Sequence, residues 1–173
     1  MVGALTRPDL LVCTDMGTEV ADFIATEPAK AVFVHAKAGA GSRLSASALH
    51  DVASQAMKNL MYMQPLVDDE PKAKNWTRPW SSSGVVGTAP RQRVGAFATT
   101  QQIWQHIRGV IADPQSEHEV WLVIGRSLSR SALEEEAARP RPRAEALQIY
   151  SLLQTTWGAV SQVGARLRIF CSP

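Results

Sequence analysis

The chain has 173 residues, 45% of them hydrophobic, which is enough to close the core of one domain of ordinary size. Its formal net charge of +2 is far below that of a histone-like or polybasic membrane-binding protein, so any contact with nucleic acid must be local. No apolar run approaches membrane-spanning length, and the N-terminus lacks a signal-peptide core. Cys13 and Cys171 have no metal-ligand spacing around them, so we expect reduced thiols, a cytoplasmic protein and no membrane partner.

The first third of the chain predicts strands and then a helix. Short β-rich runs at 10–13, 19–26 and 31–37 are separated by turn-forming residues, which indicates a three-stranded meander. From Ser45 the apolar residues recur at a spacing of three to four, which predicts a helix of about 17 residues packed on the meander. Either Ser45 or Ser47 could cap it.

The rest of the chain alternates between helices and strands. Residues 68–95 are rich in Pro, Gly and basic residues and are expected to form a long loop. A capping box at residues 99–102 predicts a second helix, 120–126 a buried strand, 144–163 a third helix and 166–171 a last strand. Residues 133–143 are polar and broken by prolines, and Ser129 or Ser131 could cap a helix over 132–138. This order predicts a single α/β domain, residues 1–173, with a mixed sheet.

Polar residues at the end of the meander are the candidate site. His35 and Lys37 share a parity on their strand, whereas Val32, Val34 and Ala36 form the opposite, apolar face, which we expect to pack on the helix. Asp22 lies on the strand paired with theirs, so an acid, an imidazole and an ammonium could converge. Such a set suits phosphodiester hydrolysis assisted by a divalent ion.

Three segments carry a resemblance to a known family. They are Asp-Met-Gly-Thr-Glu-Val-Ala-Asp-Phe-Ile (15–24), Phe-Val-His-Ala-Lys (33–37) and Ser-Ala-Leu-His-Asp-Val-Ala-Ser-Gln-Ala-Met-Lys-Asn-Leu (47–60). Together they resemble the core of a PD-(D/E)XK restriction-endonuclease-like domain. They are most similar to the Mrr-like nuclease domains fused C-terminally to bacterial superfamily-two helicases of restriction or phage-defence systems. The resemblance is weaker at 120–126 and 166–173.

The resemblance implies both a fold and a site. The expected fold has three layers, with a central mixed sheet flanked by helices. The implied site has Asp22 as the metal-binding acid, His35-Ala36-Lys37 as the D/E/Q-x-K triplet and Gln55 as the helix glutamine, with Glu19 or Asp15 as a weaker second acid. Asp22 and His35 would hold Mg²⁺ or Mn²⁺. Histidine departs from the family's acid or glutamine, which puts metal preference and activity in question.

The resemblance also implies partners. DNA would be the substrate, a helicase or ATPase module would belong to the full-length protein, and a homo-oligomer is possible. Because the family's usual helix before the first strand has no room here, we expect the sequence to come from a longer protein. The candidate phosphate contacts are Arg43, Lys58, Lys72, Lys74, Arg78, Arg91 and Arg93.

Two alternatives stay open at this stage. The basic loop, with Trp76 and Trp80 between its cations, could grip phosphates and stack on bases, or its tryptophans could simply pin it to the core. The domain itself could be a nuclease, or a non-cleaving nucleic-acid or protein interaction module in which His35 has replaced the catalytic acid. Residues 38–42 lack the pattern of a nucleotide-binding loop.

Overall fold

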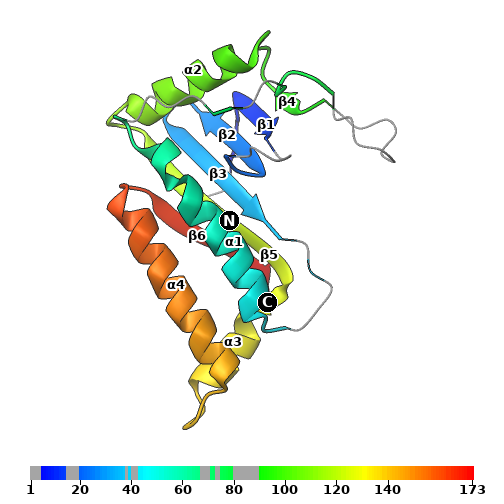
Figure 1. Ribbon diagram of the computed structural model, residues 1–173, viewed down its shortest axis with the longest axis vertical. Coiled ribbons are helices and arrows are strands. Elements are labelled where there is room, and N and C mark those ends of the chain that lie inside the picture. The colour runs from blue at the N-terminus through cyan, green and yellow to red at the C-terminus, as the bar shows by residue number, and fades with distance from the viewer. Residues whose placement is uncertain are drawn as a thin grey trace.

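The computed structural model describes residues 5–14, 20–37, 39, 43–66, 71–72, 75–79 and 90–173. Within them, six strands form one mixed sheet in the order β4-β1-β2-β3-β5-β6 (Figure 1). The strands are β1 (Leu10–Cys13), β2 (Phe23–Glu27), β3 (Lys30–Ala36), β4 (Gln92–Val94), β5 (Glu117–Ser129) and β6 (Arg166–Ser172). The meander β1-β2-β3 is antiparallel, as predicted, and β5 and β6 then add in parallel to β3.

The helices are α1 (Ala46–Asn59), α2 (Thr100–Ala112), α3 (Arg130–Ala137) and α4 (Ala144–Gln162), and a 3-10 turn, η1 (Leu60–Met63), continues α1. The hydroxyl of Ser45 caps α1 and that of Ser129 caps α3, while Thr99 and Gln102 form the predicted capping box of α2. The polar segment after Ser129 is therefore helical up to the residues before its prolines. Strand β4 was not predicted, because its three residues, Gln92, Arg93 and Val94, are too few to show an alternating pattern.

All four helices pack on the same face of the sheet. Residues that lie opposite one another across the strands share a face, and one such set joins the helices in a single apolar core. The strand residues of this core are Leu10, Val12, Ile24, Ala31, Phe33, Val120, Leu122, Ile124 and Leu128. The α/β class and mixed sheet are thus confirmed, but the described residues form two layers, without a second helical layer. None of their helices is both long and apolar enough to cross a membrane.

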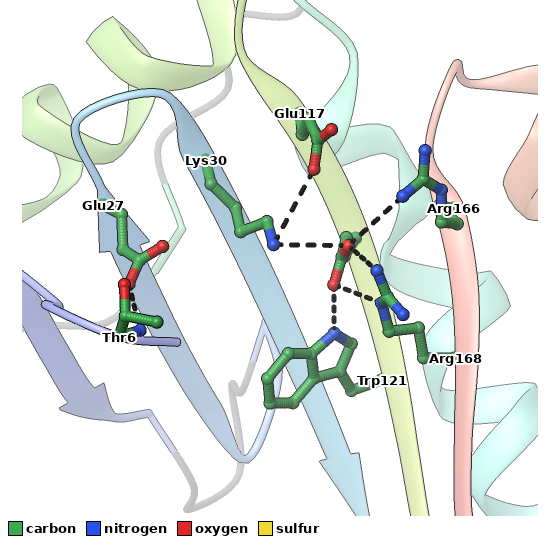
Figure 2. A network of polar contacts seen from close by, with 8 residues as sticks. Thr6, Glu27, Lys30, Glu117, Trp121, Arg166 and Arg168 are labelled. Carbon is green, nitrogen blue, oxygen red and sulfur yellow. Dashed lines mark hydrogen bonds and ion pairs between the residues drawn. The ribbon is translucent and has the colours of Figure 1, made fainter. Parts of the chain in front are cut away.

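A charged network covers the opposite face instead. Glu119, near the beginning of β5, is fully buried although it is a carboxylate. It accepts two hydrogen bonds from Arg168, at 2.7 and 2.8 Å, and one from the Trp121 indole at 2.6 Å. The Lys30 ammonium lies 3.4 Å away, so side chains from three strands converge on one carboxylate (Figure 2). This network lets the sheet bury a charge without a helix above it.

The network sets the protonation of Glu119. Burial acts to raise the pKa of this carboxyl, but hydrogen bonds from Arg168 and Trp121 and the charges of Lys30 and Arg168 outweigh it, so the net pKa is lowered. A carboxyl with a lowered folded-state pKa stabilises the fold at pH values above its unfolded-state pKa. That stabilisation is lost as the pH falls through the folded-state pKa.

We expect Glu119→Gln to lower the free energy of unfolding by about 2–3 kcal/mol at pH 7, because it leaves the Arg168 guanidinium without the carboxylate to which it donates two hydrogen bonds. The difference in unfolding free energy between variant and parent should narrow as the pH falls below the unfolded-state glutamate pKa and through the lowered folded-state pKa of Glu119. Urea unfolding of variant and parent, at pH 7 and at acidic pH, measures this difference in free energy. Glu117→Gln is the matched control: it removes a more exposed carboxylate 3.7 Å from Lys30 and should cost within about 0.5 kcal/mol. Equal losses would contradict the assigned role of Glu119.

Candidate functional site

The predicted site residues lie at the end of the sheet where β3 stops and β2 begins. Asp22 immediately precedes β2, and its amide donates to the Val34 carbonyl at 2.9 Å, which continues the β2–β3 ladder. The β2–β3 register ends at the pair formed by Phe23 and Val34, the neighbours of Asp22 and His35 in the chain. The Asp22 carbonyl also accepts from the Thr14 amide at 3.0 Å, which fixes it to the end of β1. The Asp22 backbone is therefore held from both neighbouring strands.

The carboxylate of Asp22 reaches the triplet directly. Its Oδ2 accepts a hydrogen bond of 2.6 Å from the amide of Ala36, the residue between His35 and Lys37. The acid therefore contacts the backbone of the triplet at Ala36. A carboxylate has about four acceptor positions on two oxygens, so this bond leaves capacity for a cation or a water molecule.

His35 lies on the helix-covered face of β3. Its side chain is buried, with the residue only 1% exposed, and it shares its face with Ala31 and Phe33, which belong to the core under the helices. The prediction that Val32, Val34 and Ala36 would pack on the helix is therefore wrong. Bulk decides the orientation, because Phe33 is the largest side chain of this strand and needs the deeper side.

Lys37 continues past the strand toward α1. Its amide donates to the Val123 carbonyl at 2.9 Å, so β5 holds its backbone in place. Its ammonium lies 3.1 Å from a carboxylate oxygen of Asp51 on α1, and both side chains are about half exposed. Such an exposed ion pair is weak and can exchange for another anion.

Asp51 is the site residue that sequence reasoning missed. It lies within the third resembling segment, one helical turn before Gln55, and residues at i and i+4 share a helix face. The half-buried Gln55 therefore follows Asp51 along the side of α1 that meets Lys37. An acid and an amide at this spacing beside a strand-end lysine were the signal available in the sequence. The predicted acids Glu19 and Asp15 lie outside the described residues.

The basic residues predicted to contact DNA differ in their exposure and in their partners. Lys58, Lys72, Arg78 and Arg93 are exposed, and Arg43 donates to the hydroxyls of Ser129 and Ser131 at 3.2 and 2.9 Å. Lys74 and Trp80 lie outside the described residues. These exposed cations stay candidates for phosphate contact.

Two residues of the predicted basic loop are structural. Arg91 is only 4% exposed, and its carbonyl accepts from the Cys13 amide at 2.9 Å, so its assignment as a surface cation is wrong. Trp76 is fully buried and packs edge-on against Trp104, with ring centroids 6.2 Å apart. Of the two alternatives for this loop, pinning to the core is confirmed for Trp76, because a buried ring cannot stack on a base.

Among the described residues, no three His, Cys, Asp or Glu side chains form a group that could hold a metal ion by themselves. Mg²⁺ does not require such a cage, since it is commonly bound by one or two carboxylates and several water molecules. Asp22 supplies one carboxylate of that smaller donor set, whereas the imidazole of His35 is a nitrogen donor that suits Mn²⁺ better than Mg²⁺. The chain matches no protein-family model, no curated protein and no solved structure.

The difference in burial between His35 and Lys37 predicts different costs of replacement. His35→Ala should lower the free energy of unfolding by about 1–3 kcal/mol, because it empties a buried position under α1. Lys37→Ala should change it by less than about 0.5 kcal/mol, because it removes only a half-exposed ion pair. Urea unfolding of both variants beside the parent is the measurement. A larger loss for Lys37→Ala than for His35→Ala would contradict the described positions.

Proposed function

We propose that this chain is a divalent-metal-dependent deoxyribonuclease domain of the PD-(D/E)XK type, the nuclease arm of a helicase-linked restriction or anti-phage protein. One observation carries the proposal: the Asp22 carboxylate is hydrogen-bonded to the amide between His35 and Lys37. The acid and the triplet thus lie side by side on antiparallel strands, and α1, with Gln55, follows directly in the chain. The helicase partner rests on the resemblance of residues 15–60 alone.

In this proposal each side chain has a separate task. Asp22 and His35 would hold Mg²⁺ or Mn²⁺, which supplies Lewis-acid polarisation of the scissile phosphate when bound. The Lys37 ammonium would leave Asp51 for the phosphate and stabilise the negative charge that develops during attack by water. Gln55, on the adjacent helix, would orient that water or a phosphate oxygen through its amide.

Nicking of supercoiled plasmid with Mg²⁺ or Mn²⁺, with and without chelator, tests the activity. Asp22→Asn and Lys37→Ala should each slow nicking by about 10²-fold or more, because each removes a charge used at the reacting phosphate. Arg130→Ala is the matched control, since it removes an exposed cation in an i,i+4 pair on α3 and should nick at the parental rate. Parental rates for Lys37→Ala, or no nicking by the parent in either metal, would overturn the proposal.

A second candidate is a non-cleaving nucleic-acid or protein interaction module on the same fold. It is favoured by the burial of His35, since a ring that is 1% exposed occupies a position where the family has an acid or glutamine that reaches the metal. On this alternative His35 packs under α1, while Lys37 and the exposed cations bind phosphate without hydrolysis.

Replacing His35 separates the two candidates. If the imidazole ligates, Mn²⁺ should support faster nicking than Mg²⁺, because a nitrogen ligand suits borderline ions better. His35→Gln restores a residue type of the family triplet without burying a charge, and it should keep cleavage and shift the preference toward Mg²⁺. His35→Ala should lose most activity while still folding, as checked by circular dichroism. Cleavage by His35→Gln alone, with none by the parent, would establish the interaction module.

A further inference from the structure

The outer face of α4 is unusual for a surface helix. No residue from 146 to 165 is charged, although one side of this helix faces solvent for its full length. Trp157 is 63% exposed and Leu147 is 53% exposed, two of the largest exposed apolar side chains in the described residues. Protein interfaces are depleted in charge and enriched in aromatic residues, whereas solvated helix faces carry charges.

Five exposed or partly exposed positions on the outer side of α4 follow the spacing of a helix-packing seam. Leu147, Ser151, Gln154, Gly158 and Ser161 alternate in steps of four and three, the heptad period that keeps one line of a helix against a partner. This seam points away from the core, which α4 contacts through Ile149, Thr156 and Val160 on its other side. Most of its residues are small, so another helix could approach closely.

Gly158 supports a close approach from outside. Glycine within a helix costs about 0.5–1 kcal/mol relative to alanine. The fold itself does not require it, because a Cβ atom built at Gly158 would meet nothing within 4 Å. An apolar groove also runs along α4 beside the seam, with a volume of about 340 Å³, lined by Leu153, Trp157, Leu167 and Ile169. The outer side of α4 at Gly158 is therefore open, and no other part of the described fold packs against it.

Charges at the helix ends indicate the orientation of the partner. Three arginines, at 139, 141 and 143, lie just before α4, where the positive end of its own helix dipole disfavours cations. Arg139 and Arg143 bind Glu136, at 2.8 and 2.7 Å, but within the described residues Arg141 forms no ion pair. The last turn of α4 has no basic residue. An antiparallel copy of α4 would bring the arginine-bearing end of each chain beside the carbonyl end of the other, whose last turn carries no cation.

We propose that this chain forms a two-fold symmetric homodimer in which the seam of α4 packs antiparallel against the seam of a second copy. Gln154 lies at the dyad and meets its own copy, Ser151 meets Gly158 of the second chain, and Leu147 meets Ser161. Such an isologous contact uses one self-complementary patch twice. The absence of charge removes any repulsion between the two copies, and it makes DNA an unsuitable occupant of this face.

Two variants with one introduced cysteine test the geometry, each in a Cys171→Ser background in which the buried Cys13 is the other thiol. Gln154→Cys should form a disulfide-linked dimer under mild oxidation, because both copies lie at the dyad. Ser161→Cys should not, since seven residues from the dyad at 1.5 Å each place the two thiols about 21 Å apart. Equal cross-linking of both variants, or cross-linking of Ser161→Cys alone, would overturn the antiparallel arrangement. Melting curves confirm that both variants are folded.

Sedimentation equilibrium of the full chain tests the association itself. The parent should be dimeric at tens of micromolar protein, and Ser151→Glu should weaken the dimer at least tenfold by placing a carboxylate in the seam opposite Gly158. Gln101→Glu adds the same charge at an exposed position of α2 and should leave the parental dimer intact. A monomeric parent, or a Ser151→Glu variant that dimerises as strongly as Gln101→Glu, would overturn the proposal. Neither result depends on nuclease activity.

Discussion

The parallel pairing of β5 with β3 is the constraint on which the rest of the structure depends. β5 pairs with the whole length of β3 and then extends beyond it, so that it also binds the segment leading into α1. Lys37 donates to Val123, and Ser45 donates to the Ser127 carbonyl at 2.9 Å. One strand therefore fixes both ends of the connection that carries Lys37 to α1. Gly39 lies in that connection because a Cβ there would fall 1.8 Å from the Ser127 hydroxyl.

Local signals in the sequence accounted for most of the elements. The meander, the capped starts of α1 and α2 and the extent of α4 depend on turn residues, caps and periodicity, which act over a few neighbours. The layer arrangement could not be predicted in the same way. It depends on which strand face receives the helices, and on β3 the polar His35 lies on the same face as the bulky Phe33. It also depends on Glu119, whose burial is possible only because Arg168, distant in sequence, returns to neutralise it.

The candidate site shows the same division. The contact of Asp22 with the backbone of the triplet was predictable, because two short strands joined by a turn lie side by side in a hairpin. Asp51 was not, because its contact with Lys37 needs α1 to lie beside the end of β3, and the β5 pairing decides that. Arg91 was misassigned because its charge was read without the β1–β4 contact that draws its backbone into the sheet. The residues that were missed or misassigned, Asp51 and Arg91, are thus those whose positions depend on pairing between distant segments of the chain.

The charges of the site set an order for the proposed reaction. Apart from the imidazole of His35, its described ionisable groups are the carboxylates of Asp22 and Asp51 and the ammonium of Lys37, whose formal charges sum to −1. A phosphodiester would be repelled by this set, and Lys37 is already paired with Asp51 at 3.1 Å. With a divalent ion bound the set would carry +1, so phosphate could then compete with Asp51 for Lys37. The half-exposed position of this ion pair suits such an exchange, because a pair in water costs little to open.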